Sequence, residues 1–345
     1  MDLLPYKENT ASINHILIQS FNAIGLLILI FTASSGLLVL SGFLTFKNSV
    51  LDMQSVQSEV LGAKTCSANF KSVSMPLTGL ADSYVTMEGR KFDLEGGLYP
   101  NSQNKYSVEH EALGLMVANE VRENESNFGM LAIGGDSASK IFTHFIPLLA
   151  TDLSVNSKLH VINGAYANST ILSWASSENT AVWDNAVKHV YDAGISPADV
   201  SILWIQMEPD PFLLQTVEFP KNITLYSENL SKIMSTALEN FPSIELVYVT
   251  SSYRNYSYDK NVLSEPAFFE TGYGVKSFVA NNLHNTSPWV SWGPYLWSNS
   301  SDWSAANLDT DCISLSNKGA AILSETLVSF FKADKVSSLW FLDSN

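Results

Sequence analysis

The chain has 345 residues, and its 34 acidic residues outnumber its 19 basic residues to give a formal net charge of -15. This acidic balance argues against a basic nucleic-acid-binding surface. The composition, 46% hydrophobic and 15% charged, argues against wholesale disorder. Two cysteines cannot build a disulfide scaffold or a four-cysteine zinc site, and the sequence contains no Gly-rich phosphate loop and no HExxH motif. We therefore expect no nucleic-acid partner, no metal and no cofactor.

The N-terminal part contains an uncharged apolar segment, residues 21–46. It is longer than the roughly 20 residues that span a bilayer. We predict a short tail (1–14), a transmembrane signal-anchor (15–46) and a stalk (47–89), with the following domain outside the cytoplasm. A cleavable signal peptide, cut near Ala33, is the alternative, and the domain would then be secreted. The uncleaved anchor is favoured because the apolar segment continues well beyond that site.

The cysteines and the glycosylation sequons also bear on whether the domain lies outside the cytoplasm. Cys66 and Cys312 could pair under oxidising conditions or remain as thiols, and the sequence leaves both open. Seven N-x-S/T sequons are compatible with a glycoprotein outside the cytoplasm. They begin at Asn124, Asn168, Asn222, Asn229, Asn255, Asn285 and Asn299.

The main domain is predicted to span residues 90–345. Helical periodicity first becomes clear over 109–121, and from Gly129 short apolar segments alternate with helical patterns. Strands are predicted at 130–133, 159–162, 201–205 and 244–250, and helices at 141–149, 181–191, 226–238 and 320–331. This alternation predicts an α/β fold in which helices cover both faces of a parallel sheet.

In such sheets ligands bind beyond the C-terminal ends of the strands. The predicted ends carry four polar segments, although polar loops are also ordinary. These segments are 134–139, 163–169, 206–210 and 250–256. In the last of them, Tyr253 and Arg254 could hold an anionic substrate group or simply face solvent.

Ser137 follows a predicted strand and opens a helix. A serine at this position is a candidate nucleophile, because a helix N-terminus favours a developing oxyanion. The alternative is that Asp136, Ser137 or Ser139 caps the helix.

The loop before the last helix (308–319) holds Asp311, but the residue three positions later is Ser314. A hydrolase with this topology would have a histidine there, oriented by the aspartate, to take the proton of the nucleophile. A hydroxyl cannot act as a base near neutral pH. None of the six histidines lies in this loop, and His110 is the best candidate from elsewhere in the chain.

Several strings together resemble the SGNH/GDSL-type hydrolases, and in particular a poorly characterised branch of them. They are GGDS (134–137), DCISLSNKG (311–319), EGGLYPNSQN (95–104), NGAYANSTILSW (163–174), LWIQMEPDP (203–211), EPAFFETGYGVK (265–276) and PWVSWGPYLW (288–297). The resemblance implies a three-layer α/β/α fold with a flavodoxin-like parallel sheet. In active relatives it implies ester or acyl hydrolysis without a metal.

The resemblance also assigns positions, and several depart from the pattern. The serine position falls on Ser137, or on Asp136 when the following helix is aligned without a gap. The histidine position falls on Ser314. The oxyanion-binding glycine of the second block falls on Ala167. The asparagine of the third block has no match: Gln206 could substitute for it, although the strand register could instead place Met207 at this position. The segments around these positions add Gly135, Asn163 and Gly164 as binding candidates.

The aromatic segment 288–297 has two interpretations. Trp292 and its aromatic neighbours could stack on sugar rings in a cleft. Core packing beside the edge of the sheet is the favoured interpretation.

The leading prediction is a membrane-anchored SGNH-hydrolase-like ectodomain that is catalytically impaired and has a surface or glycan-related role. The second hypothesis is an active serine acyl-ester hydrolase or acyltransferase that uses Ser137, Asp311 and a histidine from outside the usual loop. The third is a structural surface protein without a ligand. A glycan or an acyl ester is the expected ligand class in the first two.

Overall fold

The computed structural model describes residues 75–79, 82–86, 89–123, 127–257 and 265–343, which all fall within one compact unit, Glu59–Asn345. The predicted membrane anchor, residues 15–46, lies outside the described residues. Cys66 lies outside them as well, so its pairing with Cys312 stays a prediction. Within the described ranges, no helix combines the length and the apolar character needed to cross a membrane.

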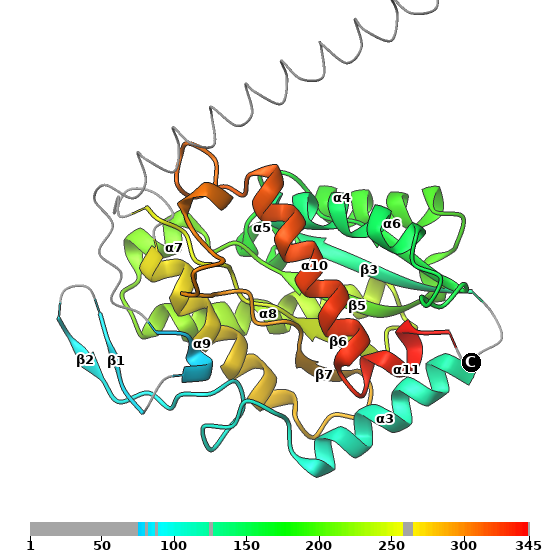
Figure 1. Ribbon diagram of the computed structural model, residues 1–345, viewed down its shortest axis with the longest axis horizontal. Helices are drawn as coiled ribbons and strands as arrows, with labels where there is room; N and C mark the ends of the chain where they lie inside the picture. The colour runs from blue at the N-terminus through cyan, green and yellow to red at the C-terminus, as the bar shows by residue number, and fades with distance from the viewer. Residues whose placement is uncertain (1–74, 80–81, 87–88, 124–126, 258–264, 344–345) are drawn as a thin grey trace, which may run out of the picture. The chain divides into compact units, whose positions relative to one another are not determined.

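The centre of the domain is a parallel sheet of five strands in the order β4-β3-β5-β6-β7 (Figure 1). The strands are β3 (Phe128–Gly134), β4 (Leu159–Asn163), β5 (Val200–Gln206), β6 (Leu246–Val249) and β7 (Trp289–Trp292). Counted along the chain within this sheet, the order is 2-1-3-4-5. The predicted parallel α/β sheet is confirmed, and β7 is a fifth strand that was not predicted.

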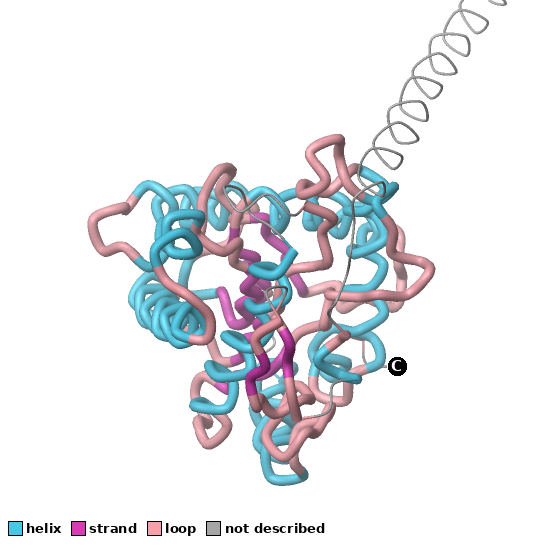
Figure 2. Tube along the Cα trace, turned by 90° about the vertical axis from the view of Figure 1, so that its left-hand side faces the viewer, coloured by secondary structure: helices cyan, strands magenta, loops and turns pink. Residues whose placement is uncertain are grey.

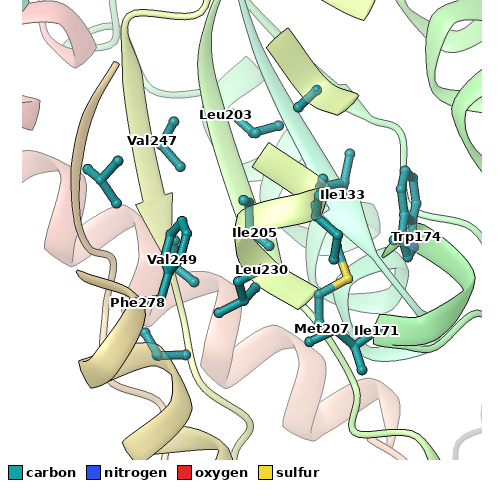
Figure 3. Close-up of a cluster of buried hydrophobic side chains, with 14 of the residues drawn as sticks. Ile133, Ile171, Trp174, Leu203, Ile205, Met207, Leu230, Val247, Val249 and Phe278 are labelled. Atoms are coloured by element: carbon teal, nitrogen blue, oxygen red, sulfur yellow. The ribbon is translucent and has the colours of Figure 1, made fainter. Parts of the chain in front are cut away.

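Helices cover both faces of the sheet (Figure 2). Alternate residues of each strand point to opposite faces, and since nearly all of them are apolar, both faces have to be buried. One face, which includes Leu203 and Val247, packs against helices that follow β4, β5 and β6 (Figure 3). These helices are α5 (Ile171–Ala175), α6 (Ala181–Asp192), α8 (Lys221–Asn240) and α9 (Glu265–Asn282). The other face, which includes Trp204 and Tyr248, packs against α3 (Val108–Glu123), α4 (Asp136–Ala150), α10 (Asn317–Ala333) and α11 (Ser337–Phe341).

The remaining elements are short. A two-stranded antiparallel sheet precedes α3, and one-turn helices occupy several connections. They are η1 (Leu77–Gly79), β1 (Tyr84–Val85), β2 (Lys91–Phe92), η2 (Pro197–Asp199), α7 (Pro211–Thr216) and η3 (Ala305–Asn307). Leu77 and Tyr84 are buried in the same core cluster as α9.

Three of the strings that carried the family resemblance contact one another along the edge strand β7. The Lys276 Nζ in α9 donates to the carbonyl oxygens of Glu95 and Gly96, at 2.9 and 2.5 Å. The Trp292 indole N–H donates to the Leu98 carbonyl at 2.7 Å. The Tyr99 hydroxyl lies 2.7 Å from Ser291 Oγ. These contacts cover β7 with the segment before α3, which protects an edge that could otherwise pair with another strand.

The topology also fixes where a crevice can form. The chain leaves β3 toward α4 on one face of the sheet and leaves β5 toward α8 on the other. Neighbouring strands whose connections diverge in this way create the topological switch point at which α/β proteins bind ligands. The C-terminal ends of β3 and β5 are therefore the place to look for a functional site.

Candidate functional site

Ser137 lies in the first turn of α4, where its side chain points inward and is 5% exposed. Its Oγ is 3.2 Å from the Tyr253 hydroxyl, which itself donates to the Ile313 carbonyl at 2.8 Å. Because a phenol has one proton, Ser137 is the donor in the first bond. Burial raises the pKa of Tyr253, so this partner stays protonated and cannot accept the serine proton.

Asp136, the other position to which the resemblance assigns the serine, has the opposite orientation. Its side chain is exposed, and its carboxylate accepts the Asn168 N–H at 3.1 Å. At the end of β3 the Asp136 carboxylate is therefore exposed, whereas the Ser137 hydroxyl is buried.

The loop before α10 meets the start of α4, as the resemblance implies. Tyr253 bridges Ser137 and Ile313, and the Lys140 Nζ in α4 donates to the Asp309 carboxylate at 3.0 Å and to the Leu315 carbonyl at 2.6 Å. The first and last sequence blocks are therefore joined at one end of the sheet.

Asp311 and Ser314 are also in contact. The Ser314 Oγ donates to Asp311 Oδ2 at 2.6 Å, and the amides of Ile313 and Ser314 both donate to Asp311 Oδ1 at 2.9 Å. The aspartate thus holds a hydroxyl where a hydrolase would have it orient an imidazole. This pair can shape the loop, but it cannot accept a proton from a nucleophile.

His110 lies at the other end of the sheet. Its ring stacks on Trp289, the first residue of β7, with ring centroids 4.7 Å apart, and its Nδ1 is 2.9 Å from the Leu283 carbonyl. Burial lowers the pKa of this imidazole. In a parallel sheet the first residue of β7 lies opposite the strand ends that carry Ser137, so the structure does not bring His110 to the site.

The other histidines do not supply a base either. Among the described residues, no imidazole forms a hydrogen bond with Ser137. His160 approaches the Ala193 carbonyl at 3.2 Å, and the others lie on α4, α6 and the turn after α9. These are His144, His189 and His284, whereas His15 lies outside the described ranges.

The loop after β4 packs against α4. Asn163 donates from Nδ2 to the Ser139 carbonyl at 3.0 Å, and its Oδ1 accepts the Ala165 amide at 3.3 Å. Gly164 lies against Leu131, since a Cβ at this position would be 2.6 Å from the Leu131 Cδ1. Ala167 is exposed farther along the loop. Asn163 is therefore positioned by α4, whereas Gly164 packs against β3 and α6.

Gln206, at the end of β5, is 1% exposed and faces the α4 side of the sheet. Among the described residues its Oε1 has no hydrogen-bond partner, and the same is true of the neighbouring Thr250 Oγ1 and Trp204 Nε1. Thr250 Oγ1 and Trp204 Nε1 both lie close to Gly293, since a Cβ at this glycine would be 2.5 Å from the first atom and 3.4 Å from the second.

Glu208 was not singled out from the sequence, yet it has the most direct contact with the start of α4. Its Oε1 accepts the Ser137 amide N–H at 2.7 Å. Burial raises the pKa of the Glu208 carboxyl above its ordinary value, although hydrogen bonds from the Ser137 side chain and from the Ser137 amide oppose this rise. The nearby Asp136 charge adds to the rise. The only sequence signal was an acidic residue directly after a buried strand.

The aromatic segment around β7 is part of the core, as favoured from the sequence. Trp292 is 2% exposed and is held by the Leu98 carbonyl, so its ring is not presented to a ligand. Arg254 is also buried, with its guanidinium 5.1 Å from the Tyr256 ring centroid and 5.5 Å from that of Trp297. Solvation of Arg254 at the surface, the simpler alternative, is therefore wrong.

Comparison with known proteins leaves the family of this chain open. No family model and no curated protein matches it. Among solved structures, it is similar to one from Streptococcus pneumonia described as "a putative platelet activating factor". The identity is 14% and the TM-score 0.36, over 64% of this chain and 92% of that chain. The site is accordingly assigned from the residues of this chain alone.

Proposed function

We propose that the chain is a membrane-anchored protein with an SGNH-hydrolase-like domain whose catalytic set is degenerate, and that it acts without catalysis in surface glycan or envelope biology. The strand order 2-1-3-4-5 supports this, because it is the flavodoxin-like order. Helices on both faces give the three layers that the resemblance implies. The first and last sequence blocks meet at the strand ends, where such an enzyme would have its site.

The pairing of the hydroxyls carries the proposal. The nucleophile of a Ser-His-Asp enzyme needs an adjacent imidazole, but the Ser137 hydroxyl bonds to Tyr253 and interacts with the Glu208 carboxyl, and Asp311 bonds to Ser314. In a Ser-His-Asp enzyme, loss of the base costs on the order of a millionfold in turnover and leaves a residual rate of about 10³–10⁴ over water. The alternative of an active enzyme requires an imidazole at Ser137, and none of the described histidines is there.

Activity is tested with the full-length chain and p-nitrophenyl acetate, with Ser137→Ala as the matched control. We expect the two proteins to hydrolyse the ester at the same background rate. A wild-type rate clearly above that of Ser137→Ala would contradict the proposal, because removing a working nucleophile costs up to about a millionfold in turnover.

The surface role has two separate tests. A glycan array with the purified chain should show binding, whereas silence on the array would favour the structural surface protein. Protease added outside intact cells should digest the domain if the apolar segment 21–46 anchors it outward. Protection of the domain from protease would contradict that orientation.

The sequons give the localisation proposal a residue-level prediction. Asn168, Asn285 and Asn299 are exposed, whereas Asn229 and Asn255 are buried. We therefore expect glycans, where the producing cell attaches them, at the exposed asparagines. Peptide mapping that found them mainly at the two buried positions would contradict the described fold.

A further inference from the structure

The two edges of the central sheet differ in how they are protected. The segment before α3 covers the edge strand β7, whereas among the described residues no strand lies beside the outer edge of β4. Within Leu159–Asn163 there is no proline, no Lys, Arg, Asp or Glu, and no shift of register against β3. Natural proteins usually protect an edge strand with one of these features or with a cover. The edge of β4 is therefore open.

The ladder with β3 determines which backbone groups of β4 point outward. The Phe128 N–H donates to the Lys158 carbonyl at 3.1 Å, and the Gly164 N–H donates to the Ala132 carbonyl at 3.0 Å. In a parallel ladder a strand uses alternate residues for each neighbour. The even-numbered residues of β4 therefore bond to β3, and the backbone groups of its odd-numbered residues point away from the sheet.

The odd-numbered residues are Leu159, Val161 and Asn163, and each is partly exposed. The Leu159 N–H donates to the Asn156 carbonyl at 3.0 Å. Among the described residues, the N–H groups of Val161 and Asn163 have no backbone partner, and neither do the carbonyls of Leu159 and Val161. The edge thus presents two donors and two acceptors to another strand.

The surface beside this edge is apolar and carries little charge. A cavity of about 280 Å³ opens between β4 and the C-terminal half of α4, and its lining includes Ile146 and Val161. Leu148 and Leu153 are exposed by 38% and 97%, and residues 141–151 contain no Asp, Glu, Lys or Arg. In a chain with a formal net charge of -15, two copies can approach here with little charge repulsion.

We propose that the open edge of β4 pairs with β4 of a second copy of this chain, as antiparallel strands related by a two-fold axis at Val161.

The outward groups are complementary to themselves in this arrangement. Val161 of each copy donates to the Val161 carbonyl of the other, and Asn163 of each copy donates to the Leu159 carbonyl of the other. These four hydrogen bonds use the two donors and two acceptors of both edges. The Leu159 N–H, which Asn156 already satisfies, is not needed. A second copy carries the same groups in reverse order, which is what a two-fold interface requires.

The test is the dimer dissociation constant of the full-length chain in detergent, measured by analytical ultracentrifugation over a dilution series. The wild type should form dimers at micromolar concentration. Val161→Lys keeps the backbone N–H but opposes two ammonium groups at the axis, and it should weaken dimerisation by at least about a hundredfold. The matched control is Val161→Thr, which keeps the β-branched shape and the N–H and should dimerise like the wild type.

Two further variants separate the backbone from the added charge. Val161→Pro removes the outward N–H, which an edge strand tolerates. Two of the four hydrogen bonds are then lost, and dimerisation should weaken by about tenfold or more. Phe212→Lys adds the same charge at an exposed position of α7, beyond the end of β5, and should leave the dissociation constant unchanged. Circular dichroism checks that each variant is folded.

The proposal is overturned if the wild type is monomeric at micromolar concentration, or if folded Val161→Lys and Val161→Pro dimerise as tightly as the wild type. Dimers that persist in both variants would be held by another surface, such as the apolar segment 21–46. The pairing uses neither Ser137 nor the loop before α10, so its outcome is independent of whether the domain is catalytic.

Discussion

A double-mutant cycle on Ser137 and Tyr253 tests the hydrogen bond in which the serine hydroxyl donates to the phenol and not to a base. The changes are Ser137→Ala, Tyr253→Phe and the two together. Tyr253 is 1% exposed, and its hydroxyl serves both Ser137 and the Ile313 carbonyl. Removing this hydroxyl deletes one buried hydrogen bond, to Ser137, and one partly buried hydrogen bond, to the Ile313 carbonyl.

The magnitudes follow from what each variant loses. Each bond has a net worth of about 0.5–1.5 kcal/mol, so Tyr253→Phe should lower the free energy of unfolding by about 1–3 kcal/mol. Ser137→Ala loses one bond and leaves Tyr253 bonded to Ile313, so it should lower it by about 0.5–1.5 kcal/mol. The two changes share one bond, and the cycle should give a coupling energy of about 0.5–1.5 kcal/mol.

The assay is urea denaturation of the full-length chain in detergent, followed by tryptophan fluorescence. The reasoning is refuted if the two changes are additive within about 0.3 kcal/mol, because distant, independent sites behave in that way. Additivity would mean that the phenol does not hold the Ser137 hydroxyl, whose other interaction is with the Glu208 carboxyl.

Two more predictions concern the scaffold. Lys276→Met should lower the free energy of unfolding by about 1–3 kcal/mol, since it leaves the buried Gly96 carbonyl and the partly buried Glu95 carbonyl without their donor. A loss under about 0.5 kcal/mol in urea denaturation would show that the edge cover is dispensable. The second prediction concerns His110, whose pKa is lowered by burial. As the pH falls, the unfolded chain therefore binds a proton at His110 before the folded chain does. The free energy of unfolding should then decrease as the pH drops below about 6.5. His110→Gln keeps a donor for Leu283 and should flatten this pH dependence, and an unchanged slope between about pH 7 and pH 5 would contradict the buried neutral imidazole.

The elements that could be predicted are those with a pattern of their own. Strands β3 and β5 are buried along their whole length, and their continuous apolar segments were recognised. Helix α9 was missed because it is buried on nearly every side and so lacks an amphipathic period. Its Gly272 and Gly274 lie close to Leu77 and Tyr226, contacts that only the folded chain reveals.

The sequence predicted which loops form the candidate site but not which side chains contact one another there. The segment after β3 was expected at the C-terminal edge of the sheet because parallel strands share that edge. The loop before α10 was expected there only from the resemblance to hydrolases. The bridge by Tyr253 depends on the path of the chain after β6, which no local pattern encodes. Glu208 looked like any polar loop residue, and its meaning arises only because β5 lies beside β3 and Gly135 leaves room for the carboxylate.

Covalent labelling by a fluorophosphonate, followed by intact mass and peptide mapping, tests most directly whether the strand-end hydroxyl has a proton acceptor. Full-length wild type and Ser137→Ala are treated side by side at neutral pH. The account predicts no adduct on Ser137 above the level of the control. A stoichiometric adduct on Ser137 that is lost in Ser137→Ala would show an activated nucleophile and contradict the account.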